Sequence, residues 1–537
     1  MIIYWMGDFR MGIYLNPGYE NFRRTLAADI YVDKTMMIKA MNRFIDKGQN
    51  YICMSRPRRF GKTIASEMLS SYYSKGCDAR ELFAPYKIAG DPSFEGKLNK
   101  YNVLKIDWNS EYQNVEDTEN LIKIVTEDIK TEMRKEFPGI TMDSDDSLGK
   151  SILKIYSGTG ETFVIIMDEY DVFIRENVSK DLFAKYLKLL NGLFKSATLR
   201  PAISLAYLTG ILPIVRDRVQ SKLNNFSEYT ILDSGELAEY VGFTADEVKD
   251  LCRQYDMDYE ECKSWYDGYA QHGYEIYNPE SVVKSMTNGR FGLYWNKTST
   301  YMVIVDRIRE NFRGTKEAVI RLLSGESAEV SVGKYMNTMD YFRSKDDIFT
   351  YLIHLGYLAY DMDSETCRIP NREVRQEWIY SIEDDEEYEV TDKIIRDSKE
   401  LLKQTIAGDA EAVARALDES HIHVTSNRSY NNEDALGGAI YLSYIYALNS
   451  YICVREMRTG KGFADVVYIP VHGGDPEKPA MIIELKRNDR VESAMDQIKE
   501  RKYFDSLVHY RGRLLFVGID YDEKEKTHTA KLEWFEK

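Results

Sequence analysis

One buried-strand pattern constrains the fold of this 537-residue chain more than any other feature. Five consecutive apolar residues at 163–167 are followed at once by Asp168 and Glu169. An apolar run of this kind is typical of a strand covered on both faces, as in a parallel sheet. Similar runs, separated by stretches with helical spacing, lie at 51–55, 102–108, 202–210 and 229–233. Strands that alternate with helices in this way predict a parallel α/β sheet with right-handed crossovers.

The rest of the chain divides by pattern into a helical region and a second α/β region. Helical spacing dominates the middle of the chain, and the acidic run at 383–387 marks its end. Beyond that run we expect helices near 393–418, 432–449 and 491–505, and strands at 464–469, 480–486 and 513–520. The predicted domains are residues 11–235, 236–385 and 390–537.

Charge and cysteine usage narrow the class of protein. A net charge of −16 argues against binding nucleic acid through the overall field, although a local basic groove stays open. The six cysteines are scattered without metal-ligand or redox spacing, which favours free thiols in a reducing cytosol. The N-terminal apolar run is too short for a signal peptide, and no segment approaches the roughly 18 apolar residues of a membrane span. We therefore expect a cytoplasmic protein without membrane contact, with Met1 and Met11 both open as the native start.

A candidate phosphate-binding loop follows the first predicted strand. Residues 55–67 read SRPRRFGKTIASE, and Gly61, Lys62 and Thr63 have the order that such a loop requires. Backbone amides at a helix N-terminus hold the phosphates, the lysine reaches the terminal phosphates, and the hydroxyl group ligates Mg²⁺. The full pattern has a glycine five positions before Gly61, where this chain has Arg56. The alternative is a helix start whose arginines lie in solvent.

The acidic end of the longest apolar run completes the nucleotide hypothesis. Asp168 can hold the metal ion, and Glu169 can be the general base that orients the attacking water. Thr209, at the end of a later strand, is a candidate sensor of the γ-phosphate. Arg216 or Arg218 is a candidate for stabilising charge in the transition state. The alternatives are acidic residues that end a buried strand at the surface and arginines on a solvated helix.

Short segments spread over the first half of the chain together resemble the AAA-ATPase-like proteins of bacteria and archaea that carry a nuclease-type domain at the C-terminus. The segments are YVDKT (31–35), SRPRRFGKT, MDEYD, TGILPI, NNF, WYDGY and YNPES. That family's loop commonly reads S-R-P-R-R-F-G-K-[ST], so Arg56 is its usual residue. The resemblance implies an N-terminal P-loop NTPase with a helical lid region, and Asp168 and Glu169 as its metal and hydrolysis pair, while turnover stays open. It also implies that the whole loop contacts ATP: Arg56, Arg58, Arg59, Phe60, Gly61, Lys62 and Thr63.

A second candidate site lies near the C-terminus. Glu484 and Lys486 stand two residues apart on an apolar strand, so their side chains project to the same side. If the strand that begins near Asp465 pairs with this one, Asp465 and Glu484 converge on one hard cation with Lys486 beside it. Magnesium-dependent phosphodiester cleavage needs two carboxylates that hold the metal and a lysine that positions or neutralises phosphate. The alternative for each carboxylate is a surface charge on an edge strand.

These three residues resemble the PD-(D/E)XK nuclease superfamily. The resemblance implies an α/β nuclease domain in which Glu433, on the preceding helix, is a further metal ligand. Gln497 matches the glutamine of the helix after the core hairpin, and Tyr503 lies on that helix. Ala464 stands where the family often has proline. The implied catalytic residues are Asp465, Glu484, Lys486 and Gln497.

Three functions fit this combination. The leading hypothesis is an enzyme that binds and hydrolyses ATP with Mg²⁺ and carries a nuclease, dependent on Mg²⁺ or Mn²⁺, that acts on DNA. The second is a nucleotide-controlled switch whose C-terminal domain holds nucleic acid without cutting it, which the net charge of −16 favours. The third is an interaction scaffold with two degenerate sites. AAA-type ATPases often form rings, so a homo-oligomer stays open.

Overall fold

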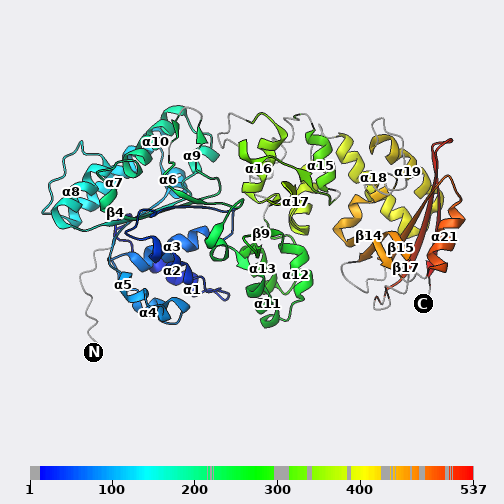
Figure 1. The fold of residues 1–537 in the computed structure, drawn as a ribbon, viewed down its shortest axis with the longest axis horizontal. Helices are drawn as coiled ribbons and strands as arrows, with labels where there is room; N and C mark the ends of the chain where they lie inside the picture. Colours follow the sequence, from blue (N-terminus) through cyan, green and yellow to red (C-terminus); the bar gives the residue numbers. More distant parts are fainter. Residues whose placement is uncertain are drawn as a thin grey trace. The chain divides into compact units, whose positions relative to one another are not determined.

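The computed structural model shows two α/β regions, each built on its own sheet (Figure 1). The residues that it describes are 12–214, 216–217, 220–221, 223–295, 312, 314–323, 325–334, 342–383, 389–424, 436, 440–441, 443–459, 462–470, 478–501, 507, 510 and 512–535. The chain divides into two compact units. The first contains residues 1–296 and 328–371, and the second contains residues 297–327 and 372–537.

The first unit is built on a five-stranded sheet with the order β2-β3-β4-β1-β7. Its strands are β1 (Tyr51–Ser55), β2 (Asn102–Asp107), β3 (Phe163–Asp168), β4 (Ile203–Gly210) and β7 (Ser227–Tyr229). Every pairing in this sheet is parallel. The prediction of a parallel α/β sheet is therefore confirmed. The carboxyl ends of β1, β3 and β4 meet at one edge, because these strands are neighbours in the sheet.

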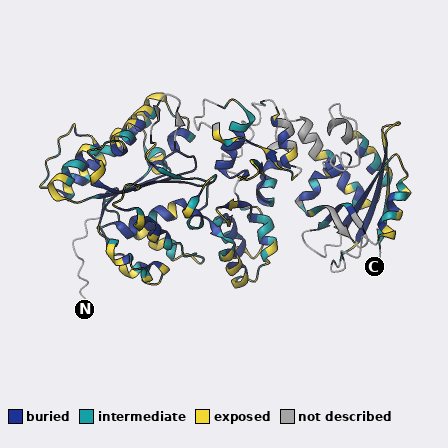
Figure 2. Ribbon diagram, viewed as in Figure 1, coloured by how far each residue is buried: buried dark blue, intermediate teal, exposed yellow. Residues whose placement is uncertain are grey.

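Helices cover both faces of this sheet, as Figure 1 shows. On one face lie α1 (Glu20–Leu26), α2 (Met36–Phe44), α3 (Lys62–Tyr73), α4 (Arg80–Phe83) and α5 (Phe94–Lys97). On the other lie α6 (Trp108–Asn114), α7 (Leu121–Glu136), α8 (Leu148–Thr159), α9 (Val172–Arg175) and α10 (Lys180–Phe194). The strands are buried and the outer helix faces are exposed (Figure 2). This two-sided cover explains the unbroken apolar run of β3, all six of whose residues are buried.

The middle of the chain adds helices and two small antiparallel sheets to the first unit. The helices are α11 (Ala245–Gln254), α12 (Tyr259–Tyr266), α13 (Pro279–Asn288) and α16 (Lys345–Leu355). One sheet contains β8 (Phe243–Thr244), β10 (Tyr274–Tyr277) and β9 (Tyr269–Gln271), and the other contains β11 (Ala328–Glu329), β13 (Thr366–Arg368) and β12 (Ala359–Asp361). A two-stranded pair, β5 (Arg216–Asp217) and β6 (Gln220–Ser221), follows β4. We refer to the described residues of 243–295 and 342–371 as the lid region.

The second unit is built on a mixed sheet with the order β14-β15-β16-β17-β18. Its strands are β14 (Tyr451–Thr459), β15 (Gly462–Pro470), β16 (Ala480–Arg487), β17 (Leu514–Asp522) and β18 (Thr527–Phe535). Only β16 and β17 pair in parallel; the other pairings are antiparallel. The helices of this unit are α15 (Thr315–Leu323), α17 (Arg372–Glu383), α18 (Glu389–Ala407), α19 (Ala410–Val424) and α21 (Val491–Glu500). Helix α21 packs on β16 and β17, and α19 packs on β18.

Among the described helices, none combines the length and the apolar character that a membrane crossing requires.

Candidate nucleotide and nuclease sites

The phosphate loop connects the end of β1 to the start of α3. Gly61 is the N-cap of α3 and has a φ of 92°, in the left-handed region that favours glycine. Apart from its chain neighbours and the backbone of α3, no described residue has an atom within 4 Å of the position that a Cβ would take at Gly61. The first amides of a helix have no partner within the helix. These groups, together with the helix dipole, provide a site for an anion at the start of α3.

Lys62 is buried at this helix start, with 4% of its side chain exposed. Its Nζ donates to the carbonyl of Pro57 at 3.1 Å and lies 3.7 Å from Oε1 of Glu169. Thr63, the next residue, is exposed. The structure therefore brings together the ammonium group, the hydroxyl group and the acidic end of β3 that the sequence predicts.

Asp168 ends β3 and is buried beside α3. Its Oδ2 accepts a hydrogen bond from Ser66 Oγ at 3.1 Å. Burial raises the pKa of Asp168 to about 6, helped by the charges of Glu169 and Asp107. Asp107 is paired with Asp168 in the register of β2 and β3. Asp107 and Ser66 are not among the site residues predicted from the sequence, although Asp107 lies near the end of the predicted strand at 102–108.

Glu169 has a φ of 49° just after β3, and its carboxylate lies among cations. Oε2 pairs with Arg175 Nη2, while Oε1 is the atom near Lys62. Burial acts to raise the pKa of this carboxyl group, but the positive charges of Lys62, Arg175 and Arg58 outweigh it and lower the pKa below its ordinary value. Glu169 is therefore ionised at neutral pH, as a general base must be.

The remaining predicted nucleotide residues differ in placement. Thr209 is fully buried one residue before the end of β4, and its carbonyl accepts the amide of Tyr170 at 3.1 Å. Arg216 belongs to β5, but its side chain is outside the described residues, and so is all of Arg218. Arg58 lies close enough to Glu169 to lower the pKa of that carboxyl group.

Three loop side chains turn to the protein interior or the lid region. Arg56 is fully buried; its Nη1 donates to the carbonyls of Ser55 and Tyr229, and burial lowers its pKa to about 10. Arg59 Nη1 donates to Tyr294 O at 3.1 Å, and its Nε lies 3.3 Å from Glu280 Oε2. The buried ring of Phe60 meets the ring of Tyr269 edge-on at 5.3 Å. For these three residues, contact with the nucleotide stays a prediction.

The second site forms where β15 pairs with β16. Val466 is opposite Ile483, so the next residues along these antiparallel strands are Asp465 and Glu484. Asp465 Oδ2 accepts the backbone amide of Leu485 at 2.7 Å. The charge of Asp465 also acts on Glu484, so the two carboxylates are near one another.

Lys486 and Gln497 both reach one oxygen of Glu484. Lys486 Nζ lies 3.3 Å from Oε1, and Gln497 Nε2, from α21, donates to the same atom. Within the described part of the chain, Oε2 of this 1% exposed residue accepts no hydrogen bond. Burial raises the pKa of Glu484 to about 7, and the nearby charge of Asp465 adds to this effect.

This donor set fits a divalent cation. An unpartnered buried carboxylate oxygen next to a second carboxylate is costly to ionise until a positive charge arrives. Hard oxygen ligands of this kind suit Mg²⁺ or Mn²⁺. The predicted ligand Glu433 and the predicted helix residue Tyr503 lie outside the described residues.

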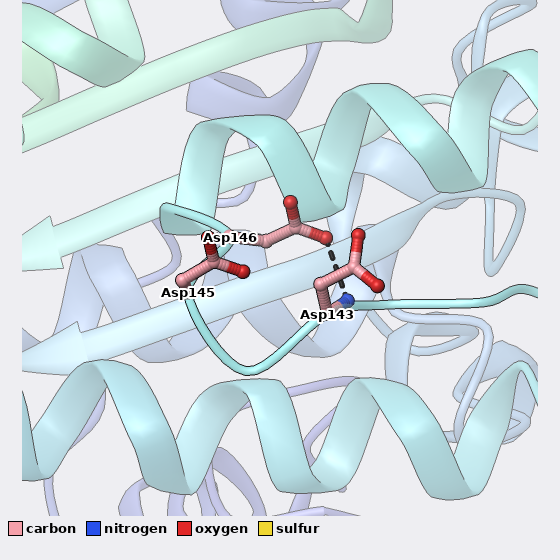
Figure 3. Close-up of side chains that lie close together, drawn as sticks. All are labelled: Asp143, Asp145 and Asp146. Carbon is pink, nitrogen blue, oxygen red and sulfur yellow. Dashed lines mark hydrogen bonds between the residues drawn. The ribbon is translucent and has the colours of Figure 1, made fainter.

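A third group of carboxylates lies in the loop before α8 (Figure 3). Lys154 Nζ lies 2.7 Å from Asp143 Oδ2 and 2.5 Å from Asp146 Oδ2, and Lys150 Nζ lies 2.7 Å from Asp146 Oδ1. Asp146 Oδ2 also accepts the backbone amide of Asp143 at 2.8 Å. Because Asp143 and Asp146 already pair with these lysines, we assign the turn a structural role at the start of α8.

The two sites define an α/β protein with a nucleotide-binding loop and a carboxylate–lysine centre, and comparison with known families agrees. Residues 17–220 match the family described as predicted AAA-ATPase, and residues 432–531 match the PD-(D/E)XK nuclease superfamily. The chain thus carries a domain of each class, and both resemblances are confirmed. These domains support ATP binding and a nuclease-like function.

Known relatives add little to this assignment. A curated protein of Azotobacter chroococcum mcd 1, described as an uncharacterized protein in the vnfD 5'region, is 25% identical over 312 residues, which are 55% of this chain and 55% of that one. The chain thus spans about half the length of this relative.

Three solved structures are similar to this chain at low sequence identity. The Cdc6p protein of Pyrobaculum aerophilum is 12% identical with a TM-score of 0.23, and the match covers 65% of this chain and 93% of that one. The ORC2 protein of Aeropyrum pernix, in its ADPNP-ADP complexes, is 10% identical with a TM-score of 0.30, over 67% and 98%. The ORC1 protein of Aeropyrum pernix, in complex with DNA, is 10% identical with a TM-score of 0.24, over 92% and 99%. At these TM-scores the likenesses carry no conclusion about this chain.

Proposed function

We propose that this protein binds and slowly hydrolyses Mg-ATP at the phosphate loop and cleaves DNA at a metal-dependent centre on β15 and β16. The observation that carries the proposal is that Asp465 and Glu484 lie on the paired strands β15 and β16, next to the pair of Val466 and Ile483, with Lys486 beside Glu484. Two converging carboxylates and a lysine are the groups that phosphodiester hydrolysis requires.

At the first site, each group of the chain has a separate proposed role. The start of α3 and Lys62 hold the phosphates, and Thr63 and Asp168 would hold Mg²⁺. When bound, that ion neutralises charge that develops on the transferred phosphoryl group. Glu169 is ionised and can orient and deprotonate the attacking water. Thr209 and Arg216 remain our candidates for contact with the γ-phosphate.

At the second site, Asp465 and Glu484 would hold Mg²⁺ or Mn²⁺, with Glu433 as a further proposed ligand. When bound, the cation lowers the pKa of its water and stabilises charge on the phosphate. Lys486 is placed to hold a phosphate oxygen, and Gln497 fixes the carboxylate of Glu484 by donating to Oε1.

A second candidate function is a nucleotide-controlled protein that holds nucleic acid without cutting it. The net charge of −16 argues against holding nucleic acid through the overall field, so this function requires a local binding site on the C-terminal domain. It predicts DNA or RNA binding that depends on ATP, with no broken strands in any metal.

The deciding experiment is a cleavage assay with the full chain. Linear, circular and single-stranded DNA, and RNA, are incubated with Mg²⁺ or Mn²⁺, each with and without ATP. We expect nicking or cutting of DNA that Asp465→Ala and Lys486→Ala abolish. Asp496→Ala is the matched control, because Asp496 is an exposed carboxylate on α21 next to Gln497.

Three outcomes separate the alternatives. Cutting that survives Asp465→Ala removes the assignment of the second site. Binding without strand breaks in either metal favours the non-cleaving switch. Cutting of RNA but not of DNA would support the assignment of the metal centre and show that its substrate is RNA.

A further inference from the structure

The carboxylate of Glu169 pairs with a buried arginine that is not among the site residues predicted from the sequence. Arg175 is the last residue of the short helix α9, and its side chain is 7% exposed. Its Nη2 pairs with Glu169 Oε2, and its Nε lies 3.2 Å from Asp171 Oδ2. One guanidinium group thus joins the two acidic residues of the MDEYD segment that flank Tyr170.

Asp171 and Tyr170 extend this contact to the end of β4. Asp171 Oδ2 accepts the backbone amides of Ile211 at 3.1 Å and Leu212 at 2.8 Å. The amide of Tyr170 donates to Thr209 O at 3.1 Å, and its hydroxyl donates to Leu212 O at 2.7 Å. The MDEYD and TGILPI segments are therefore one hydrogen-bonded unit, and Arg175 connects Glu169 to it.

The two oxygens of Glu169 face different partners. Oε2 is bound to Arg175, whereas Oε1 faces the loop and lies 3.7 Å from Lys62 Nζ. A bound triphosphate attracts the charge of Lys62, since phosphates are the stronger anionic partner. Arg175 also has an ion pair with Asp171, so its contact with Oε2 does not depend on Lys62, and Oε1 is left for a water molecule.

We propose that Arg175 is a positioning residue for ATP hydrolysis: it holds one oxygen of Glu169 so that the other faces the nucleotide. This inference rests on the proposed ATPase function. Because Arg175 acts through Glu169, its loss should slow turnover and spare nucleotide affinity.

The test combines the rate of phosphate release with the binding of a non-hydrolysable ATP analogue, both on the full chain. We expect Arg175→Ala to lower kcat about 10- to 100-fold and to leave the analogue's dissociation constant within about twofold. Arg175→Lys keeps a cation beside Glu169 and should recover part of the loss. Arg134→Ala is the control, because Arg134 is a half-exposed arginine of the same unit, 3.7 Å from Glu127.

A double-mutant cycle gives the sharper readout. Residues that act as one unit are not additive, so adding Arg175→Ala to Glu169→Gln should cause no further fall in kcat. An unchanged kcat in Arg175→Ala, or losses that multiply in the double variant, would overturn the inference. So would a joint loss of analogue binding and thermal stability in both Arg175→Ala and Arg175→Lys, which would indicate a structural role only.

The failure of this inference differs from the failure of the proposed function. If the wild-type chain releases phosphate and Arg175→Ala does so equally fast, only the role of Arg175 is overturned. If the wild-type chain binds the analogue but releases no phosphate from ATP, the proposed hydrolysis is overturned, and the role of Arg175 with it.

Discussion

The two candidate sites each contain a buried or half-buried glutamate, and its charge is compensated in opposite ways in Glu169 and Glu484. Cations of the chain surround Glu169, so that its pKa is lowered in spite of burial. Glu484 has less compensation: Lys486 and Gln497 share one oxygen, and burial raises the pKa of this carboxyl group to about 7. Glu169 thus has its compensating positive charge within the chain, whereas Glu484, like Asp168 of the first site, keeps a raised pKa, which supports our proposal that a metal ion binds at each site.

The largest effect should come from removing the first site's central cation. Lys62→Ala takes away the buried ammonium group that we propose holds the phosphates, so ATP affinity should fall about 100-fold or more. Lys185→Ala, which removes an exposed lysine paired with Asp181, should leave it unchanged. Titration with a fluorescent ATP analogue measures both; equal affinity in wild type and Lys62→Ala would make the GKT sequence a plain helix start.

The second site should lose affinity for its metal ion when the negative charge of Glu484 is removed. Glu484→Gln keeps the shape of the side chain and removes its charge. We therefore expect affinity for Mn²⁺ to fall more than about 100-fold, which is a larger loss than the substitution of a residue that only contacts a metal ligand causes. Asp496→Gln is the control on the same unit. Calorimetric titration of Mn²⁺ without nucleotide is the measurement, and undiminished binding would refute the metal assignment of Glu484.

The two sites should also lose metal at different pH values. Both relevant pKa values are raised, to about 7 for Glu484 and about 6 for Asp168, so each group takes up a proton as the pH falls through that value. A protonated carboxyl group is a poor ligand, and affinity at the second site should fall by about tenfold per pH unit below 7.

Variants isolate each site in this pH comparison. Because Lys62→Ala disables the first site, Mn²⁺ titration of this variant measures the metal affinity of the second site. Because Asp465→Ala disables the second site, titration of this variant with the ATP analogue measures the affinity of the first. As the pH is lowered, affinity at the second site should begin to fall at a higher pH than affinity at the first site does. The reverse order would contradict the difference in burial and charge that we describe.

The smallest expected effect is on stability, when a methyl group is added to a glycine that packs beside each site. A Cβ at Gly210 would lie 2.4 Å from Asp171 Oδ1. The other oxygen of this carboxylate, Oδ2, accepts the backbone amide of Leu212, so the carboxylate cannot move away freely. Gly210→Ala should therefore lower the free energy of unfolding by about 1–3 kcal/mol. At Gly518, beside the second site's helix α21, the nearest atoms are side-chain atoms of Met495 at 3.1 Å, and Met is adaptable.

Thermal unfolding of matched variants tests this difference. Gly210→Ala should lower the apparent melting temperature more than Gly518→Ala does. Gly192→Ala, inside α10 with nothing within 4 Å of its added Cβ, should raise stability by about 1 kcal/mol. Equal effects at Gly210 and Gly518 would show that the first site is no more tightly interlocked than the second.

The sequence predicts the parts of the fold that have strong apolar runs. The predicted strand at 51–55 is β1 as observed, and the run at 163–167 lies within β3. Strands β14 and β18 were missed, because charged residues interrupt both, as in YICVREMRT and THTAKLEWF. The small sheets of the lid region were missed because strands of two to four residues carry too little periodicity to detect.

Contacts between distant segments limit prediction of the sites. Spacing on one strand places Glu484 beside Lys486, and the hairpin of β15 and β16 brings Asp465 to them. Asp107 reaches Asp168 only through the pairing of β2 with β3, and nothing in the sequence of α9 marks Arg175 as the partner of Glu169. The side chains of the loop likewise depend on the lid region, which takes Arg59 and Phe60 as partners.

The most direct test of two separately built sites is one pair of crossed variants measured in both assays. Asp465→Ala should stop metal-dependent DNA cutting and leave ATP-analogue affinity as in wild type, because the residue belongs to a different sheet from the phosphate loop. Lys62→Ala should abolish analogue binding and leave Mn²⁺ binding at the second site intact. Cutting that continues in Asp465→Ala, or loss of both activities in either variant, would contradict the account.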